Sequence, residues 1–203
     1  MRASSGREIA LDPPVRPWPL GGAARDETAL IREARGGSPE AVEALVRRHW
    51  DGAHRAAFLI VQDAGAAEDI AQEAMLAAVR AIDRFDRRRP FRPWLHRIVV
   101  NRSLDWVRAR RRRPEVSAEA AEAGAGAVEP GEHARELSDE LMAALAALDP
   151  DQRALIVLRH LLGYRASELA RMLDLPPATV RTQLARALER LRALLEGEAR
   201  EAS

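Results

Sequence analysis

The sequence predicts an all-α fold made of two small helical domains joined by a flexible acidic linker. Alanine, leucine and arginine dominate its 203 residues, and this mixture favours helices. Apolar residues recur at helical spacing in two segments, and the stretch between these is acidic and punctuated by Gly and Pro. We therefore expect an N-terminal tail (1–24), a first domain (25–113), the linker (114–134), a second domain (135–197) and a short tail (198–203).

Helix starts are predicted from residues that suit the first turn. Ser38-Pro39 has an N-cap serine followed by a proline at the first helical position. In the second domain, Asp149-Pro150 has the same form, and Gln152 stands at the reciprocal capping position. Two further helices of the first domain are expected from about 66 to 82 and from about 94 to 113, on the spacing of their apolar residues.

Arginines and aromatic rings alternate in the segment RFDRRRPFRPWLHR (84–97), which interrupts the helical pattern. A buried core excludes so many charges, and a solvated loop has no need of so many rings. Single-stranded nucleic acid offers both phosphates and planar bases, so it is the natural partner. Twelve arginines and only two acidic residues lie between positions 84 and 113, which makes this part strongly basic although the chain's net charge is +1.

The segment GYRASELARMLDLPPATVRTQLARALERLRALL (163–195) has the pattern of a helix-turn-helix. Its first helix carries an apolar stripe of Ala166, Leu169, Ala170 and Leu173, and the turn is Asp174-Leu175-Pro176. Its second helix is expected to bury Val180, Leu184, Leu188, Leu191 and Leu195. The opposite face would expose Arg181, Thr182, Ala185 and Arg186, and in this motif the second helix enters the DNA major groove. An ordinary helical hairpin with a solvated arginine face is the alternative that the pattern leaves open.

Three segments in order resemble the bacterial sigma factors of the sigma-70 family, in particular the extracytoplasmic-function (ECF) subfamily. They are AEDIAQEAMLAAVRAIDRFD (67–86), RRRPFRPWLHRIVVNRSLDWVRARRRR (87–113) and the segment from LDPDQ to RLR (148–192). The resemblance implies a protein that binds core RNA polymerase, recognises the −35 and −10 promoter elements and assists promoter melting. It also implies an anti-sigma factor as a partner.

Roles for individual residues follow from the same resemblance. It implies that Asp69, Gln72 and Glu73 contact the clamp of the polymerase β′ subunit, on a helix whose Ile70, Ala74, Ala78 and Ile82 face inward. A solvated amphipathic helix is the alternative. Contacts to duplex and single-stranded DNA at the −10 element are implied for Arg88, Arg89, Phe91, Arg92, Arg97, Asn101 and Arg108. Phe91, expected in the loop before Trp94, would contact a flipped base, whereas Phe85, Trp94 and Leu95 are expected in the core. Contacts to the −35 element are implied for Arg165, Arg171, Thr179, Arg181, Thr182 and Arg186.

Several positions depart from the family's pattern, among them Asp174, Arg165, Gln183 and Pro93. Asp174 stands in the turn where the family often has Gly, and Asp adopts left-handed geometry less readily. Arg165 stands where the family usually has a small hydroxyl residue, so the first helix of the motif is expected to lack a side-chain cap.

Other classes of function are disfavoured by what the sequence lacks. There is no cysteine, the five histidines are scattered, and no nucleotide-binding, zinc-protease or serine-hydrolase motif occurs, so we expect no enzyme, metal or cofactor. No apolar run is long enough for a membrane span and the N-terminus does not resemble a secretory signal, which favours a cytoplasmic protein. A stand-alone helix-turn-helix regulator is the alternative, but it would leave the segment 84–97 without a role.

Overall fold

The computed structural model describes residues 26–112 and 137–201, and every regular element in these ranges is helical. The first domain contains α1 (Glu27–Arg35), α2 (Pro39–Val61), α3 (Ala64–Arg80), the 3₁₀ turn η1 (Ile82–Arg84) and α4 (Phe91–Arg112). The second contains α6 (Asp139–Ala146), α7 (Pro150–Ile156), the π-helical turn η2 (Val157–Leu161), α8 (Ala166–Leu173) and α9 (Pro177–Glu201). The all-α prediction is confirmed, whereas the expected tail (1–24) and linker (114–134) lie outside the described residues.

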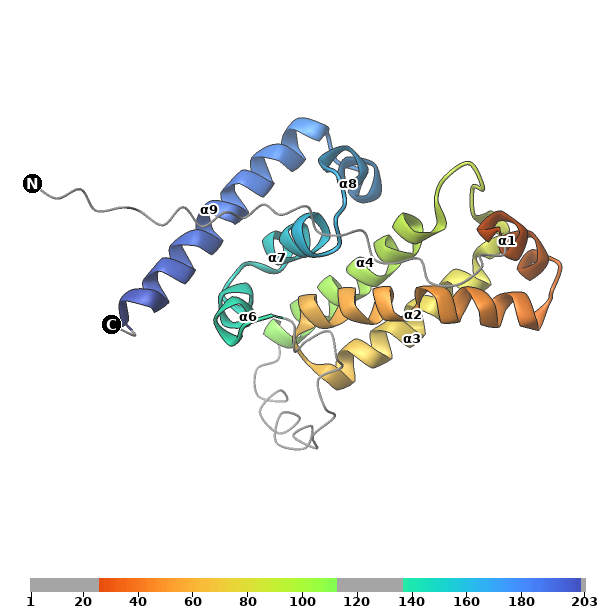
Figure 1. The fold of residues 1–203 in the computed structure, drawn as a ribbon, viewed down its shortest axis with the longest axis horizontal. Coiled ribbons are helices and arrows are strands. Elements are labelled where there is room, and N and C mark those ends of the chain that lie inside the picture. Colours follow the sequence, from red (N-terminus) through yellow and green to blue (C-terminus); the bar gives the residue numbers. More distant parts are fainter. Residues whose placement is uncertain (1–25, 113–136, 202–203) are drawn as a thin grey trace, which may run out of the picture.

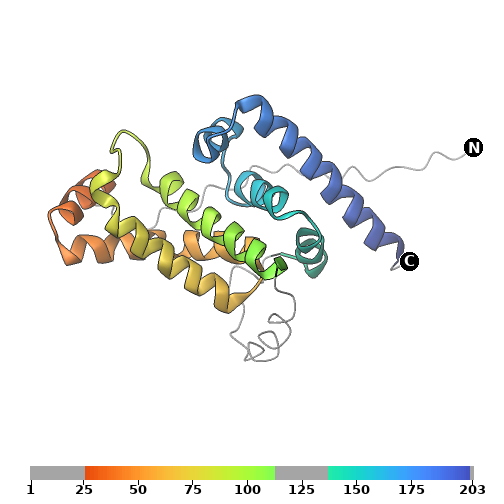
Figure 2. The same ribbon diagram turned by 180° about the vertical axis from the view of Figure 1, so that it is seen from behind.

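Alanines fill much of the space between the helices of the first domain. The buried set includes Ala53, Ala56 and Ala57 of α2 and Ala67, Ala74 and Ala78 of α3. Helices packed on such small side chains can approach one another closely. In Figure 2, α3 and α4 lie side by side, and both also contact α2. This packing leaves one face of α3 and one face of α4 on the surface.

The helices begin close to the predicted positions, but one of the predicted side-chain caps is not formed. The hydroxyl of Ser38 accepts a hydrogen bond from the backbone N–H of Ala41 at 3.2 Å, as expected for an N-cap. Asp63 caps α3 in the same way, so this helix begins at Ala64 rather than at about 66. Asp149 occupies the N-cap position of α7, but its side chain makes no hydrogen bond to that helix. The predicted capping role of the Asp149 side chain is therefore wrong.

The segment 84–97 folds differently from the expectation. Only the part before α4 is a loop, because α4 begins at Phe91 rather than near Trp94. Pro93 lies in the first turn of α4, where a missing N–H leaves no intrahelical hydrogen bond unmade. The predicted position of Phe91 in a loop is corrected accordingly.

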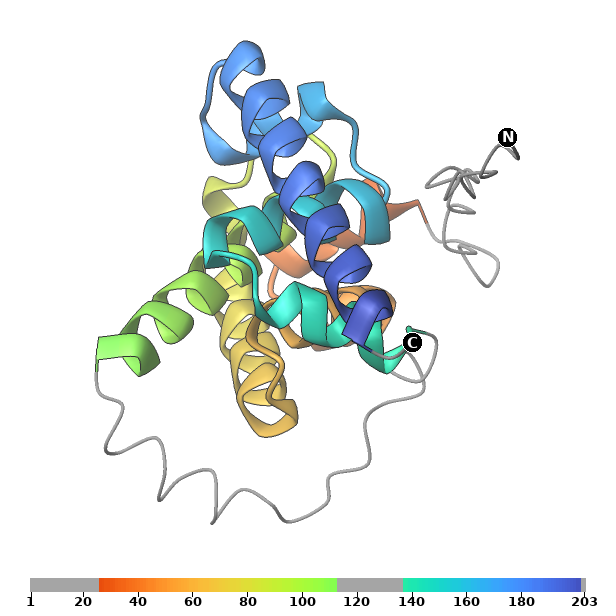
Figure 3. The ribbon, with the colours of Figure 1, turned by 90° about the vertical axis from the view of Figure 1, so that its left-hand side faces the viewer.

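The two domains lie against each other and share part of their apolar interior. Leu59 and Ile60 of α2 and Val100 and Leu104 of α4 belong to one buried cluster with residues of α7, η2 and α8. Figure 1 shows α7 beside α4, and Figure 3 shows the second domain lying over one side of the first. Leu145, Leu148, Ile156, Ala187 and Leu191 form a separate cluster inside the second domain.

Candidate nucleic-acid and polymerase interfaces

Helices α8 and α9 form the predicted helix-turn-helix. Val180 and Leu184 are buried on the inner side of α9, whereas Arg181, Thr182 and Arg186 are exposed on its outer side. The hydroxyl of Thr182 donates to the carbonyl of Ala178 at 3.0 Å, and its oxygen can still accept a hydrogen bond. On the outer face of α9, the guanidinium groups of Arg181 and Arg186 and the hydroxyl of Thr182 thus face the solvent.

The turn between α8 and α9 forms although Asp174 and Arg165 depart from the family's pattern. Asp174 has φ 57° and ψ 43°, so a non-glycine residue adopts the left-handed conformation here. Leu175 packs against the shared apolar cluster and holds the angle between the two helices. Arg165 supplies no side-chain cap, as expected from its lack of acceptors, but Glu168 accepts from the Arg165 N–H at 2.7 Å.

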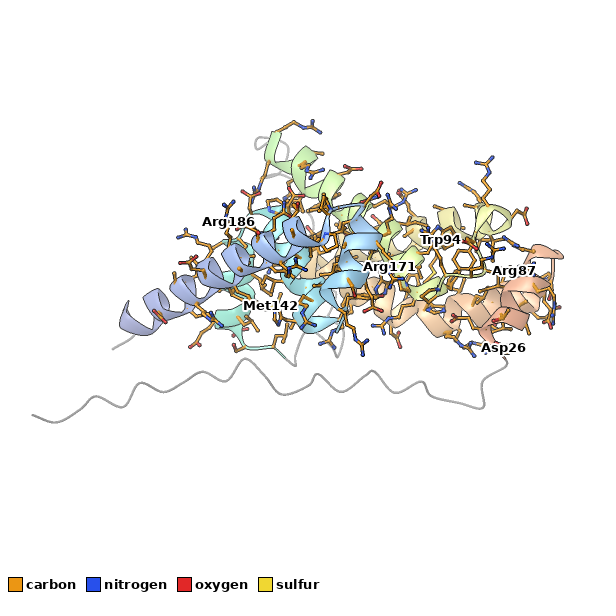
Figure 4. The ribbon with its side chains drawn as sticks, turned by 90° about the horizontal axis from the view of Figure 1, so that it is seen from above. Asp26, Arg87, Trp94, Met142, Arg171 and Arg186 are labelled. Carbon is orange, nitrogen blue, oxygen red and sulfur yellow. The ribbon has the colours of Figure 1, made fainter. Side chains whose placement is uncertain are left out.

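The remaining −35 candidates lie around this motif. Arg165 and Arg171 are exposed, and Thr179 in the first turn of α9 is half-buried. Figure 4 shows Arg171 on α8 and Arg186 on α9, both in the second domain, while Arg87 and Trp94 lie toward the other end of the molecule. The structure therefore gathers the −35 candidates on the second domain and the −10 candidates on the first.

Phe91 lies in the core and not on the surface. Only 3% of it is exposed, and its ring centroid lies 5.5 Å from Phe85, 5.4 Å from Trp94 and 5.0 Å from His49. A base cannot stack on a ring that is covered on its faces and edges. The ring is therefore not accessible for stacking in this conformation, and the implied contact of Phe91 with a flipped base stays a prediction. The core positions expected for Phe85 and Leu95 are confirmed, whereas Trp94 is only half-buried. The aromatic cluster supports the loop that carries Arg88 and Arg89, both exposed.

The other −10 candidates lie along α4. Arg97, Asn101 and Arg108 are spaced by four and seven residues, which brings them onto one side of the helix. Asn101 and Arg108 are exposed and Arg97 is half-buried. Arg92 lies on a different side, where its guanidinium donates to the carbonyl of Leu162 at 3.4 Å. Arg108 also has a partner in the second domain, since it contacts Asp151 at 2.7 Å.

The exposed face of α3 carries the three polymerase candidates. Asp69, Gln72 and Glu73 are exposed, and Ile70, Ala74, Ala78 and Ile82 are buried as predicted. Glu73 forms an ion pair with Arg102 of α4. A shallow pocket of about 330 Å³ lies between α3 and α4 and is lined by Ala66, Asp69, Ile70, Glu73, Arg102, Asp105 and Trp106.

Leu76 also belongs to this α3 face, although it was not among the predicted site residues. It lies four residues after Gln72 and three after Glu73, and 53% of it is exposed. Among the described residues no other large apolar side chain is so exposed. The signal was present in the helical period, because position 76 falls on the polar side of a helix whose other apolar residues face inward.

Three polar groups that no sequence pattern indicates are buried between the domains. Arg153 is 5% exposed and donates to the carbonyls of Ile60 at 2.7 Å, Ala146 at 2.6 Å and Leu148 at 3.4 Å. Burial lowers the pKa of Arg153 from its usual value. The hydroxyl of Tyr164 and Nδ1 of His96 share a hydrogen bond of 2.8 Å. Burial, reinforced by the charges of Arg92 and His49, lowers the pKa of His96 to about 3.

Across residues 26–112 and 137–201, no group of three or more metal-ligating side chains occurs. No helix in the same ranges combines the length and the apolar character that a membrane span requires.

Family models of sigma factors match both domains. The Sigma-70 region 2 model matches residues 45–113, and the model described as Sigma-70, region 4 matches residues 138–191. The chain is 34% identical over 171 residues to the ECF RNA polymerase sigma factor SigM of Mycobacterium tuberculosis, a match that covers 84% of this chain and 85% of that protein. It is 37% identical over 138 residues, or 64% of this chain, to the probable RNA polymerase sigma factor RfaY of Xanthomonas campestris, and spans 34% of that longer protein.

A solved structure of CnrH in complex with the cytosolic domain of CnrY has a similar fold. The TM-score is 0.63 with 30% sequence identity, and the match covers 84% of this chain and 97% of CnrH. The two helical domains with a helix-turn-helix in the second define a class of DNA-binding protein. Within that class the chain belongs to the ECF RNA polymerase sigma factors, since both sigma-factor models match in order and SigM is similar over most of both chains.

Proposed function

We propose that this sigma factor binds core RNA polymerase through α3, presents α9 to the −35 element and uses α4 with its preceding loop at the −10 element. The observation that carries the proposal is the division of α9 into two faces. Val180 and Leu184 anchor one face in the domain, while Arg181 and Arg186 project from the other. Such a helix can enter the major groove without unfolding the motif that holds it.

At the −35 element, Arg181 and Arg186 would donate paired hydrogen bonds to guanine edges or hold phosphates. Thr179 and Thr182 would accept or donate at the same groove, and Arg165 and Arg171 would contact the flanking phosphates. Contacts to phosphates fix the position of the helix on the DNA and carry little sequence information.

At the −10 element, Arg88 and Arg89 would follow the phosphates of the opened strand, and Arg97 and Asn101 would lie along α4 beside them. Trp94 replaces Phe91 as the aromatic candidate, because it is only half-buried at the rim of the aromatic cluster. Stacking of a base on such a ring contributes about 1–3 kcal/mol. The buried Phe85 and Phe91 would keep the loop in place for this contact.

On the polymerase side, Asp69, Gln72 and Glu73 would contact the clamp of the β′ subunit. A basic side chain of the clamp would compete with Arg102 for Glu73, and Leu76 would lose water on binding. Since an exposed ion pair contributes only about 0.2–1 kcal/mol, Glu73 can exchange its partner at low cost.

The proposed activity is binding and strand opening with no catalytic residue. Because RNA polymerase acts in the bacterial cytoplasm, the same compartment is implied for this chain. An anti-sigma factor is a further proposed partner, which would hold the protein away from the polymerase.

Run-off transcription with purified core polymerase tests the proposal. Fragmented genomic DNA from the source of the sequence would be transcribed with and without this protein. New starts that share two upstream elements about one and a half to two helical turns apart are expected. Binding to duplex DNA without any polymerase-dependent start would instead support the stand-alone regulator.

A further inference from the structure

Helix α1 lies beside both ends of the loop that precedes α4. We call residues 86–90 the arginine loop, because all five are exposed and three of them are arginines. Figures 1 and 2 both show α1 beside the chain that joins α3 to α4, and α1 contacts η1. The loop thus begins and ends next to a helix that contributes none of the residues implied to meet DNA.

At the entry to the arginine loop, Arg35 of α1 binds three backbone carbonyls. Its Nε donates to the carbonyl of Ile82 at 2.8 Å, and its Nη2 donates to those of Asp83 at 2.8 Å and of Phe85. The last carbonyls of a helical turn lack partners within that turn, so they are open to such a donor. Because the guanidinium is planar and its N–H groups are fixed, it holds the three carbonyls in one arrangement.

At the exit from the loop, Glu27 of α1 and His49 of α2 hold the start of α4. Oε1 of Glu27 lies 2.8 Å from Nε2 of His49, and the His49 ring centroid lies 5.0 Å from that of Phe91. The hydrogen bond with His49 lowers the pKa of Glu27 against the effect of burial, and the backbone N–H of Phe91 acts in the same direction. The Glu27 carboxylate thus serves the first turn of α4, whose N–H groups have no intrahelical partner.

Helix α1 keeps these two contacts at a fixed separation. Glu27 and Arg35 are about two turns apart on the helix. The stretch between them is anchored in the core of the first domain by Leu30, Ile31 and Ala34. A loop with both ends fixed samples fewer conformations, so it loses less conformational entropy when it binds a ligand.

We propose that Glu27 and Arg35 are positioning residues for the −10 contact: they fix both ends of the arginine loop and so hold Arg88 and Arg89 where an unpaired strand can bind them. The inference rests on the proposed role of this loop at the −10 element. Neither positioning residue needs to touch DNA, because its effect is transmitted through the loop. If the ends were released, the loop would have to be ordered during binding, which lowers affinity for the strand.

Substitutions of matched chemistry separate positioning from charge. Arg35→Lys keeps the positive charge but loses the planar group that reaches three carbonyls. Its control is Arg32→Lys, the same change at an exposed arginine of α1. Glu27→Gln removes the carboxylate, and Glu33→Gln makes the same change at an exposed position of the same helix. Urea unfolding of the four proteins measures any loss of overall stability.

Cleavage by trypsin tests the hold of α1 on the loop without DNA. Trypsin cuts after arginine, so the arginine loop offers Arg87 and Arg88 when it opens, and fragment masses identify these cuts. The rate of cleavage follows the population of the open form. Arg35→Lys should be cut here about 5- to 30-fold faster than its control, and Glu27→Gln about two- to fivefold faster than its own. Equal rates within each pair would overturn the proposal.

Two DNA probes then separate the loop from the rest of the protein. Each protein is assembled with core polymerase and titrated, by fluorescence anisotropy, with a single strand that carries the −10 element and with a duplex that carries the −35 element. Both sequences are taken from a promoter mapped by run-off transcription. Arg35→Lys should bind the single strand about 5- to 30-fold more weakly than Arg32→Lys, with unchanged affinity for the duplex.

The two probes also identify the results that contradict the proposal. Undiminished binding of the single strand by Arg35→Lys would overturn it. Equal weakening on both probes would overturn it too, because a general loss of structure acts on both domains. If even the wild-type protein failed to bind the single strand, the −10 role of the loop would fall together with the proposal, whereas the cleavage rates would still report whether α1 holds the loop.

Discussion

Low pH should destabilise the fold because His96 is buried in its neutral form. The substitution His96→Gln should remove this effect. The side chain is 1% exposed on α4, and its pKa is lowered to about 3, chiefly by burial. In the unfolded chain a histidine has a pKa of about 6.5. Below that value the unfolded chain binds a proton that the folded chain does not, so the stabilisation is complete above pH 6.5 and is lost as the pH falls toward 3.

The size of the effect follows from the same pKa values. Each pH unit in this window removes about 1.4 kcal/mol from the free energy of unfolding, so the loss between pH 6.5 and pH 5 is about 2 kcal/mol. His96→Gln keeps a group that can share a hydrogen bond with Tyr164 but has no proton to gain. Other titrating groups remain in both proteins and cancel in the comparison.

Urea unfolding followed by circular dichroism at pH 7 and pH 5 gives the required free energies. Wild type should lose about 2 kcal/mol more than His96→Gln between the two values. If His96→Gln and wild type show the same dependence on pH, the reasoning from a buried neutral imidazole is refuted.

Three further substitutions test other parts of the structure. Phe91→Ala should lower the free energy of unfolding by about 3–5 kcal/mol in a urea titration, as a core ring would, and unchanged stability would argue for an exposed role. Arg181→Ala should weaken binding to a −35 duplex by about 1–3 kcal/mol in an anisotropy titration. Arg190→Ala, nine residues later on the other side of α9, is its control and should have little effect. Leu76→Glu should weaken capture of core polymerase about tenfold without loss of stability, since burying a leucine contributes about 1.5–3 kcal/mol; unimpaired capture would exclude this side chain from the interface.

The helix-turn-helix could be predicted because its determinants are local. The 3.6-residue period assigns Val180 and Leu184 to one side of α9 and Arg181 and Arg186 to the other, and burial in the structure follows that assignment. The same period correctly assigned the inward face of α3. For such helices the sequence contains the information that decides which side chains face the solvent.

Phe91 could not be assigned in this way, because its environment depends on distant residues. Its ring packs against His49 of α2, 42 residues earlier in the chain, and against Phe85 from the preceding loop. In a segment that mixes rings with arginines, composition alone does not decide which rings are covered. The helix start at Phe91 and its burial are consequences of how α2 and α4 pack together.

Arg153 shows the same limit for a charged residue. Nothing near it in sequence indicates burial, and one of the three carbonyls that accept its hydrogen bonds belongs to Ile60, 93 residues earlier. Arginine is seldom buried without a partner, so local pattern favours an exposed position. The contact between the two domains supplies the carbonyl of Ile60, which joins those of Ala146 and Leu148 in Arg153's own domain in making its burial tolerable.

The apolar cluster shared by the domains has a consequence for the chain when polymerase is scarce. If the two domains came apart, Leu59, Ile60, Val100 and Leu104 would be exposed together on one surface of the first domain. Large apolar patches of this kind promote association between copies of a protein. A chain made in excess of polymerase should therefore remain monomeric while its domains are in contact, and should aggregate or be degraded if it is held open with nothing to cover that surface.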